Sequence, residues 1–295
     1  MNHAPVPSPR ARWRDRLLLQ EDLNFLLTNR VPRAALTRFM GWFGRIEQPL
    51  VRRASIAVWR ACTEIDLSDA QEREFSSLHA MFTRALQPGA RPVDMDPQVL
   101  TSPCDAIVGA CGPVAGTQVF QAKGFPYEIG ELFGDAEAAR PWHDGVYATL
   151  RLTSAMYHRF HAPHDGTLQR LTYLSGDTWN VNPIALRRIE RLFCRNERAV
   201  LRMRLDTGHA IALVPVAAIL VASIRLHCMD TLLHLRTLGA RPRDCAERFA
   251  KGQEMGWFEH GSTILVFAPR GFALCEGIAE GTRLRMGQAL MRLPA

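Results

Sequence analysis

The sequence has little lysine, no paired-cysteine motif and no long apolar segment, and each absence narrows the possible functions. Only two of its 36 basic residues are lysines, Lys123 and Lys251, so arginine carries nearly all the positive charge behind the formal net charge of +7. That charge is compatible with nucleic acid, anionic lipid or an acidic substrate. RNA- and DNA-binding signatures are missing, and we therefore expect no nucleic-acid partner.

Seven cysteines, an odd number without a CxxC pair, predict a reduced setting rather than a disulfide scaffold. The most apolar run, residues 210–224, is shorter than the roughly 20 residues of a membrane helix, so we expect a buried strand there. Charged residues spread through residues 10–22 leave no uninterrupted signal-peptide core. We therefore expect a cytosolic protein or one attached to a membrane face.

The first part of the 295-residue chain is helical by pattern. Residues 24–62 carry an apolar stripe at helical spacing, with arginines beside it. The stripe consists of Leu36, Phe39, Met40, Phe43 and Ile46. Together with Trp42 and Trp59, this pattern fits a helix at the lipid headgroup boundary, and it equally fits a helix that covers the core of its own domain.

The rest of the chain predicts one more helix and then a β-rich domain. Ser68 and Gln71 have the spacing of a capping box, and the helix that they begin would end at Pro88. From about residue 95, short apolar runs alternate with Gly, Pro, Asn and Asp, which is typical of strands and turns. The expected strands are 118–121, 145–152, 167–173, 200–205, 210–224 and 263–268, and 183–193 is an expected helix. The predicted fold class is α+β, with N-terminal amphipathic helices followed by a β-rich catalytic domain.

The tripeptide Gly261-Ser262-Thr263 could carry self-cleavage chemistry. The Ser262 hydroxyl lies next to the carbonyl carbon of Gly261, and glycine lets the backbone adopt strained conformations. Attack on that carbon would shift the acyl group from nitrogen to oxygen. Elimination of the ester and hydrolysis, with release of ammonia, would leave a ketone-bearing pyruvoyl group. Taken alone, such a tripeptide usually marks a turn that enters a strand.

Three histidines and an aspartate are further candidates for chemistry. His158, His161 and His164 are suited to proton transfer near neutral pH, and they also have the donor type of a zinc site. No cysteine or repeated acidic ligand accompanies them, so we expect no metal, and a purely structural role stays open. Asp105 follows a proline turn, where it either orients a distant imidazole or is solvated.

Together these segments resemble the phosphatidylserine decarboxylase family over roughly residues 25–295. Each matching segment is weak alone, and their common order makes the resemblance specific. The matching segments are 82–92, 102–105, 123–134, 157–163, 195–198, 251–258, 261–263 and 285–288.

The resemblance implies that the chain cuts itself between Gly261 and Ser262. His161 would take the hydroxyl proton of Ser262, while Asp105 orients the ring. The products would be a large beta chain, residues 1–261, and a small alpha chain, residues 262–295, whose pyruvoyl cofactor is made from Ser262. The two cleaved chains would stay associated as a heterodimer.

The resemblance also implies the reaction and the partners. The pyruvoyl group would form a Schiff base with the amine of phosphatidylserine, and loss of carbon dioxide would give phosphatidylethanolamine. His158 is the candidate proton donor. Residues 1–94 would dock peripherally on the anionic cytoplasmic side of the cell membrane, and residues 95–295 would form the catalytic domain.

Three residues depart from the family's pattern, and two of them, Ala106 and Met156, motivate the first of three alternatives. Ala106 follows Asp105 where the family usually has glycine, Met156 replaces an acidic residue, and His260 precedes the glycine of the cleavage site. A non-cleaving homologue acting as a lipid-binding protein is the first alternative. A serine hydrolase using Ser262 is the second, although no Gly-x-Ser-x-Gly elbow surrounds that residue. The third is a pyruvoyl enzyme acting on another amine-bearing carboxylate.

Overall fold

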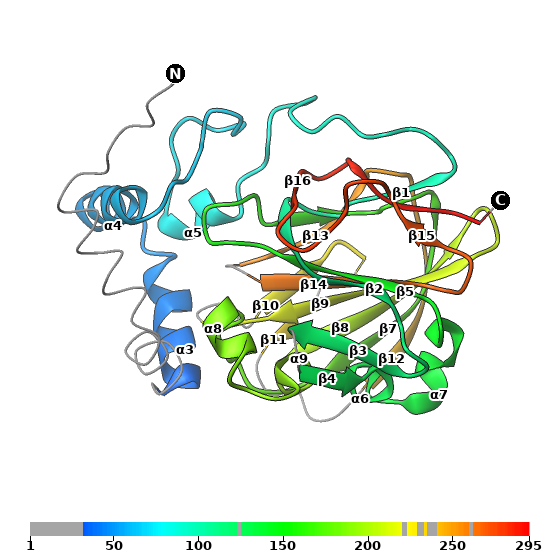
Figure 1. The fold of residues 1–295 in the computed structure, drawn as a ribbon. Helices are drawn as coiled ribbons and strands as arrows, with labels where there is room; N and C mark the ends of the chain where they lie inside the picture. Colours follow the sequence, from blue (N-terminus) through cyan, green and yellow to red (C-terminus); the bar gives the residue numbers. More distant parts are fainter. Residues whose placement is uncertain are drawn as a thin grey trace, which may run out of the picture.

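The computed structural model describes residues 32–122, 125–219, 223–228, 233–234, 241–259 and 262–294. Figure 1 shows helices α3 and α4 at one end of a β-rich body. The helices are α3 (Arg33–Phe43), α4 (Pro49–Cys62), α5 (Leu78–Phe82), α6 (Ile129–Phe133), α7 (Ala136–Ala139), the 3-10 helix η1 (Arg140–Trp142), α8 (Pro183–Leu186) and α9 (Leu192–Arg195). The first strands are β1 (Val99–Thr101), β2 (Ala106–Pro113), β3 (Gln118–Ala122), β4 (Phe125–Glu128), β5 (Val146–Arg151), β6 (Arg159–His161), β7 (Gly166–Leu174), β8 (Arg198–Leu205) and β9 (Ala210–Ala217). The remaining strands are β10 (Ser223–Leu226), β11 (Leu233–His234), β12 (Arg241–Phe249), β13 (Glu254–Phe258), β14 (Ser262–Ala268), β15 (Ala273–Leu274), β16 (Arg283–Leu284) and β17 (Ala289–Arg292).

An antiparallel sheet of eight strands forms the centre of the body, in the order β12-β7-β8-β9-β14-β5-β2-β16. β14 is an inner strand of this sheet and pairs with β9 on one side and β5 on the other. Three smaller sheets have the orders β11-β10-β13-β6, β1-β17-β15 and β3-β4. The last four strands of the chain therefore contribute to two different sheets.

Both faces of the eight-stranded sheet are buried at β9 and β14, so these two inner strands are apolar along most of their length. In β14, Ile264 and Val266 lie in one hydrophobic cluster, while Leu265 and Phe267 lie in a second. The first cluster includes Phe160 of β6, Phe258 of β13 and Met291 of β17, and the second includes Leu132 of α6, Trp142 of η1 and Leu192 of α9. The sheets β11-β10-β13-β6 and β1-β17-β15 thus cover one face, and the short helices together with β3-β4 cover the other.

The N-terminal helices are two rather than one. The structure describes them from residue 32, so the predicted helical residues 24–31 lie outside the described part of the chain. α3 ends where the Gly44 N–H donates to the Met40 carbonyl, and α4 begins with Pro49 behind the side chain of Gln48, which accepts from the Val51 N–H at 2.8 Å. Proline suits the first helical position because that position needs no intrahelical N–H donor.

The predicted helix that begins at Ser68 is wrong. The structure has only the short helix α5, capped by Ser77, whose hydroxyl accepts from the Ala80 N–H at 3.1 Å. Residue Ala70 instead forms an antiparallel bridge with Leu86. That bridge uses the backbone groups that a helix through this region would need, so capping-box spacing alone misplaced the helix start.

The predicted fold class is confirmed: the N-terminal helices precede a β-rich α+β body. The expected strands are present, although the run 210–224 forms two of them, β9 and β10. The expected helix over 183–193 is reduced to the single turns α8 and α9. In the described ranges, no helix is long and apolar enough to cross a membrane.

Candidate active site

One edge of the eight-stranded sheet gathers the predicted reactive segments. Ile107 of β2, Arg151 of β5 and Thr263 of β14 form a row of paired residues across three neighbouring strands. Asp105 lies just before β2, and Ser262 is the first residue of β14, so both strands begin at the same edge. Only β5 separates them, which corresponds to two strand spacings, or about 10 Å.

The histidine segment returns to the same edge. The chain leaves the end of β5 and re-enters a sheet at β6, whose last residue is His161. The His161 N–H donates to the carbonyl of Pro103 at 2.8 Å, and the Thr101 N–H donates to the carbonyl of Pro163 at 3.0 Å. These backbone hydrogen bonds join the segments that carry Asp105 and His161.

Asp105 is held by Arg91. The Arg91 Nε donates to Asp105 Oδ1 at 2.8 Å and its Nη2 donates to Oδ2 at 2.6 Å, while its Nη1 donates to Asp69 Oδ2 at 2.7 Å. The Met286 N–H adds a hydrogen bond of 2.9 Å to Asp105 Oδ1. Burial lowers the pKa of Arg91, but the hydrogen bonds and charges of Asp105 and Asp69 outweigh it, so the pKa lies above its ordinary value.

The ring of His161 is held by a backbone carbonyl and a phenol. Its Nδ1 lies 2.9 Å from the Gly252 carbonyl oxygen, and its Nε2 lies 3.0 Å from the Tyr157 hydroxyl. Because a carbonyl only accepts, this network assigns the ring proton to Nδ1 and leaves Nε2 as the basic atom. Burial lowers the pKa of His161 below its ordinary value, which favours the neutral ring.

The structure brings Asp105 and His161 to one edge but joins their side chains to different partners. Asp105 contacts Arg91 and Met286, whereas His161 contacts Gly252 and Tyr157. The sequence motifs alone indicated no role for Arg91, Tyr157 or Gly252. All three lie inside the matching segments 82–92, 157–163 and 251–258, which is the signal that could have identified them.

Ser262 begins β14, and its backbone pairs with Ala217 of β9. Its side chain lies outside the described residues, as do Gly261 and His260, which the sequence analysis singled out. Thr263, the next residue, is fully buried, and its Oγ1 has no hydrogen-bond partner among the described residues.

His158 lies between the sheet edge and the N-terminal helices. It is fully buried, and its ring meets Phe82 of α5 edge to face, with the ring centroids 5.7 Å apart. Phe82 in turn packs edge to face against Trp59 of α4, with the ring centroids 4.8 Å apart. His164 lies elsewhere, with its Nε2 2.9 Å from the carbonyl oxygen of Pro97.

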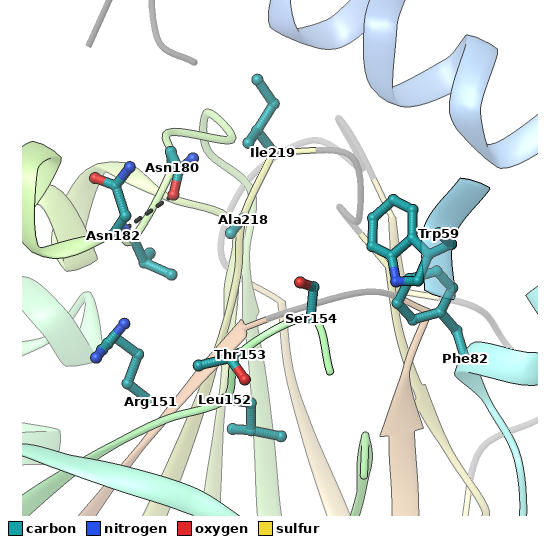
Figure 2. Close-up of a pocket in the computed structure, with 11 residues that line it drawn as sticks. Trp59, Phe82, Arg151, Leu152, Thr153, Ser154, Asn180, Asn182, Ala218 and Ile219 are labelled. Carbon is teal, nitrogen blue, oxygen red and sulfur yellow. Dashed lines mark hydrogen bonds between the residues drawn. The ribbon is translucent and has the colours of Figure 1, made fainter. Parts of the chain in front are cut away.

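A cavity of about 330 Å³ opens at this sheet edge. Figure 2 shows Arg151, Asn180 and Asn182 on one side of the cavity and Trp59 and Phe82 on the other. Its remaining lining residues are Leu152, Thr153, Ser154, Val181, Ala218 and Ile219. The cavity therefore has a polar wall and an aromatic wall, a combination that suits an amphipathic ligand.

Ala106, the first departure from the family's pattern, causes no backbone strain. It is the first residue of β2 and fully buried, and the non-glycine residues with positive φ in the described part of the chain are Asp144 and Arg191. The position therefore needs no glycine. Met156, the second departure, lies in the turn before the histidines, where its Sδ accepts from the Thr153 N–H at 3.4 Å.

Comparisons with known proteins agree on one family. The sequence model of the family described as Phosphatidylserine decarboxylase matches residues 78–292. A curated relative from Xanthomonas campestris pv. campestris, named phosphatidylserine decarboxylase proenzyme, is 40% identical over 243 residues, which cover 77% of this chain and 83% of the relative. Relatives of the same name come from Xanthomonas euvesicatoria pv. vesicatoria, with 39% identity over 77% of this chain and 84% of the relative, and from Shewanella baltica, with 37% identity over 89% and 94%.

The matched region contains the sheet edge, the histidine segment and β14, so the class of protein is an enzyme of the decarboxylase type, a carboxy-lyase. The chain belongs to the phosphatidylserine decarboxylase family. The resemblance found in the sequence is thereby confirmed.

Proposed function

We propose that this protein cuts itself at Gly261-Ser262 and then decarboxylates phosphatidylserine to phosphatidylethanolamine. The observation that carries the proposal is the meeting, at one sheet edge, of the Asp105 segment, the His161 segment, the start of β14 and the 330 Å³ cavity. The relatives' name, proenzyme, favours this function over a non-cleaving lipid-binding protein.

In self-cleavage, the neutral ring of His161 would accept the hydroxyl proton of Ser262 at Nε2. The serine oxygen then bonds to the Gly261 carbonyl carbon as the peptide C–N bond breaks, which gives an ester. Loss of the Cα proton and of the Cβ–O bond frees the carboxyl end of residues 1–261. Addition of water and release of ammonia leave the new terminus at position 262. The Gly252 carbonyl would keep the ring in this tautomer, and the charge of Asp105 would stabilise the imidazolium.

The residues at the start of β14 fit a pyruvoyl group made from Ser262. The neighbouring Thr263 Oγ1 is buried without a partner among the described residues, so a donor is present beside the new terminus. The group would supply a carbonyl that condenses with the substrate amine and withdraws the electrons left when carbon dioxide departs. His158 would deliver the proton to Cα, from its buried position behind Phe82 of the cavity wall.

The N-terminal helices would hold the enzyme peripherally on an anionic membrane face at the cytoplasmic side. α4 buries none of its residues, and four large apolar side chains of α3 and α4 are exposed: Phe39 at 51%, Trp42 at 64%, Leu50 at 75% and Val58 at 63%. Arginines of the same helices, Arg38, Arg53 and Arg60, are also exposed. Exposed aromatic and basic residues on amphipathic helices are the pattern of interfacial binding.

We propose two functional parts, residues 1–94 for membrane association and residues 95–295 for catalysis. The N-terminal part has its own small hydrophobic cluster, which includes Phe75, Met81 and Phe82 with Trp59 packed against it. Self-cleavage would divide the catalytic part into the large chain, ending at residue 261, and the small chain from residue 262, which remain together as a heterodimer.

The test is to record the intact mass of every chain in the purified protein beside a Ser262→Ala variant, and then to assay both on phosphatidylserine vesicles. We expect residues 1–261 and a fragment from residue 262 whose mass fits pyruvoyl in place of serine, an uncut variant, and carbon dioxide release from the wild type alone. An uncut wild-type chain that binds the vesicles without turnover would favour the lipid-binding alternative.

A further inference from the structure

Arg151 combines three properties that point to a ligand. It is the last residue of β5 and is paired with Thr263, so it lies one residue further along and one strand across from Ser262. It is half-buried, and it lines the 330 Å³ cavity. Burial lowers the pKa of its guanidinium, and no carboxylate in the described part of the chain offsets that burial.

An arginine in this situation is unusual in this protein. Three other buried guanidiniums have partners: Arg91 binds two carboxylates, Arg198 donates to the carbonyl oxygens of Leu132, Cys194, Asn196 and Glu131, and Arg84 donates to those of Met81 and Ala155. The Arg151 guanidinium has no ion pair or hydrogen bond among the described residues. A half-buried, uncompensated charge costs stability and is typical of a binding group that awaits its partner.

Buried hydroxyls on the same sheet face support this assignment. Strand alternation puts Arg151 on the face of Thr149, two residues earlier, and of its paired residue Thr263. Both threonine hydroxyls are buried without hydrogen-bond partners among the described residues. On this face the next residues of β14, Leu265 and Phe267, are apolar, so Arg151, Thr149 and Thr263 form a group of three unsatisfied polar side chains at this end of the strand pair.

We propose that Arg151 binds the phosphodiester of the glycerophospholipid substrate, an assignment that rests on the proposed function. The planar guanidinium presents paired donors that match phosphate oxygens. In phosphatidylserine, only Cα, Cβ and one oxygen lie between the reacting amine and the phosphorus. A substrate amine held at the start of β14 would thus put its phosphate over the adjacent strand, about 4.8 Å away, where Arg151 ends β5.

The substrate's carboxylate is the other anionic group that Arg151 could bind, and the chemistry argues against it. Carbon dioxide leaves as a neutral molecule, so an ion pair with the carboxylate would stabilise the ground state and be lost in the transition state. An ion pair with the phosphate is kept throughout the reaction. The walls agree with this orientation, because Arg151 and Asn182 lie on one side of the cavity while Trp59 and Phe82, on the side of the N-terminal helices, are suited to the acyl chains (Figure 2).

The test compares Arg151→Gln and Arg151→Lys with Arg270→Gln in the processed enzyme. Arg270 is an exposed arginine just beyond the other end of β14, so it controls for loss of one positive charge. Two soluble lipids with six-carbon acyl chains serve as probes. Phosphatidylserine measures KM and kcat, and phosphatidylethanolamine, which has the phosphate but no carboxylate, measures Kd by calorimetry.

For Arg151→Gln we expect both the KM for phosphatidylserine and the Kd for phosphatidylethanolamine to rise about 10- to 100-fold, with a smaller change in kcat. Arg151→Lys should lie between, because it keeps the charge and loses the paired donors. Arg270→Gln should match the wild type, and the intact masses should show normal self-cleavage in all three variants.

Two results would overturn the assignment: a Kd for phosphatidylethanolamine unchanged in both Arg151 variants, or an effect confined to phosphatidylserine, which would assign Arg151 to the carboxylate. Should the glutamine variant fail to fold, the lysine variant decides by the same Kd. A wild type that binds phosphatidylethanolamine through Arg151 and releases no carbon dioxide would refute the proposed function while leaving the binding role intact.

Discussion

Arg91 holds two carboxylates, and only Asp105 belongs to the segment that is hydrogen-bonded to the His161 backbone. This arrangement provides a matched pair of variants. Asp105→Asn removes the negative charge that the proposal uses to stabilise the imidazolium, so self-cleavage should slow at least about 100-fold. The rate is measured from the loss of uncut chain on a denaturing gel after synthesis in a cell-free system.

Asp69→Asn is the control, because it removes the other carboxylate from the same guanidinium. Arg91 then keeps its hydrogen bonds to Asp105, and we expect cleavage within about threefold of the wild type. Equal slowing in both variants would show that Arg91 needs both carboxylates to hold the segment, and that Asp105 has no separate role.

The lowered pKa of His161 predicts the pH dependence of self-cleavage. The ring acts as a base only when neutral, and burial keeps it neutral at pH values where an ordinary histidine, of pKa about 6.5, is half protonated. The cleavage rate should therefore fall only as the pH drops through the lowered pKa, with its midpoint below pH 6.5. A rate profile measured at constant ionic strength, with a midpoint above 6.5, would contradict this role of His161.

At the residue scale, the sequence predicted which segments come together but not which partners hold their side chains. Asp105 and His161 were chosen through family resemblance, and the structure brings their segments to one edge. Arg91 and Gly252 were missed as their partners because contacts across 14 and 91 positions depend on sheet registers that spacing alone does not contain. Arg198 also lies in one of the matching segments, but its guanidinium donates hydrogen bonds to backbone carbonyl oxygens and so has a structural role.

At the scale of elements, α3 and α4 expose the apolar surface that the proposed membrane contact needs. Replacing Trp42 and Leu50 together by serine removes two of its largest exposed side chains, and we expect binding to vesicles of anionic phospholipid to weaken by at least about tenfold. Sedimentation of the protein with sucrose-loaded vesicles measures the loss.

Met95→Ser is the matched control, since Met95 is 67% exposed and lies outside these helices. It should leave vesicle binding unchanged. If the control weakened binding as much as the double variant, the contact would extend beyond α3 and α4, and the assignment of residues 1–94 to membrane association would need a later boundary.

Strands were easier to predict than helices in this protein. Inner strands such as β9 and β14 are nearly continuous apolar runs because both sheet faces are covered there, and such runs are visible in the sequence. α8 and α9 have four residues each, too few for a helical period to show. The predicted helix from Ser68 is absent because the antiparallel bridge between Ala70 and Leu86, a non-local contact, uses the backbone groups that the helix would need.

At the scale of the whole molecule, the fragment from residue 262 is interwoven with the rest of the protein. β14 lies between β9 and β5, β16 pairs with β2, and β17 pairs with β1. After self-cleavage, the two chains should co-elute in size-exclusion chromatography and separate only at the denaturant concentration that unfolds the body. Separation at a lower concentration, with circular dichroism unchanged, would contradict this.

The inner position of β14 also determines which large chain and which small chain are paired in each molecule. Because the uncut strand is hydrogen-bonded on both sides, each small chain should remain with the large chain alongside which it was synthesised. Partners cannot be traded without unfolding the central sheet. A cell that makes an active and a defective form of this protein would therefore contain two separate populations and no hybrids. The defective form would then neither inactivate the active form nor regain activity from it.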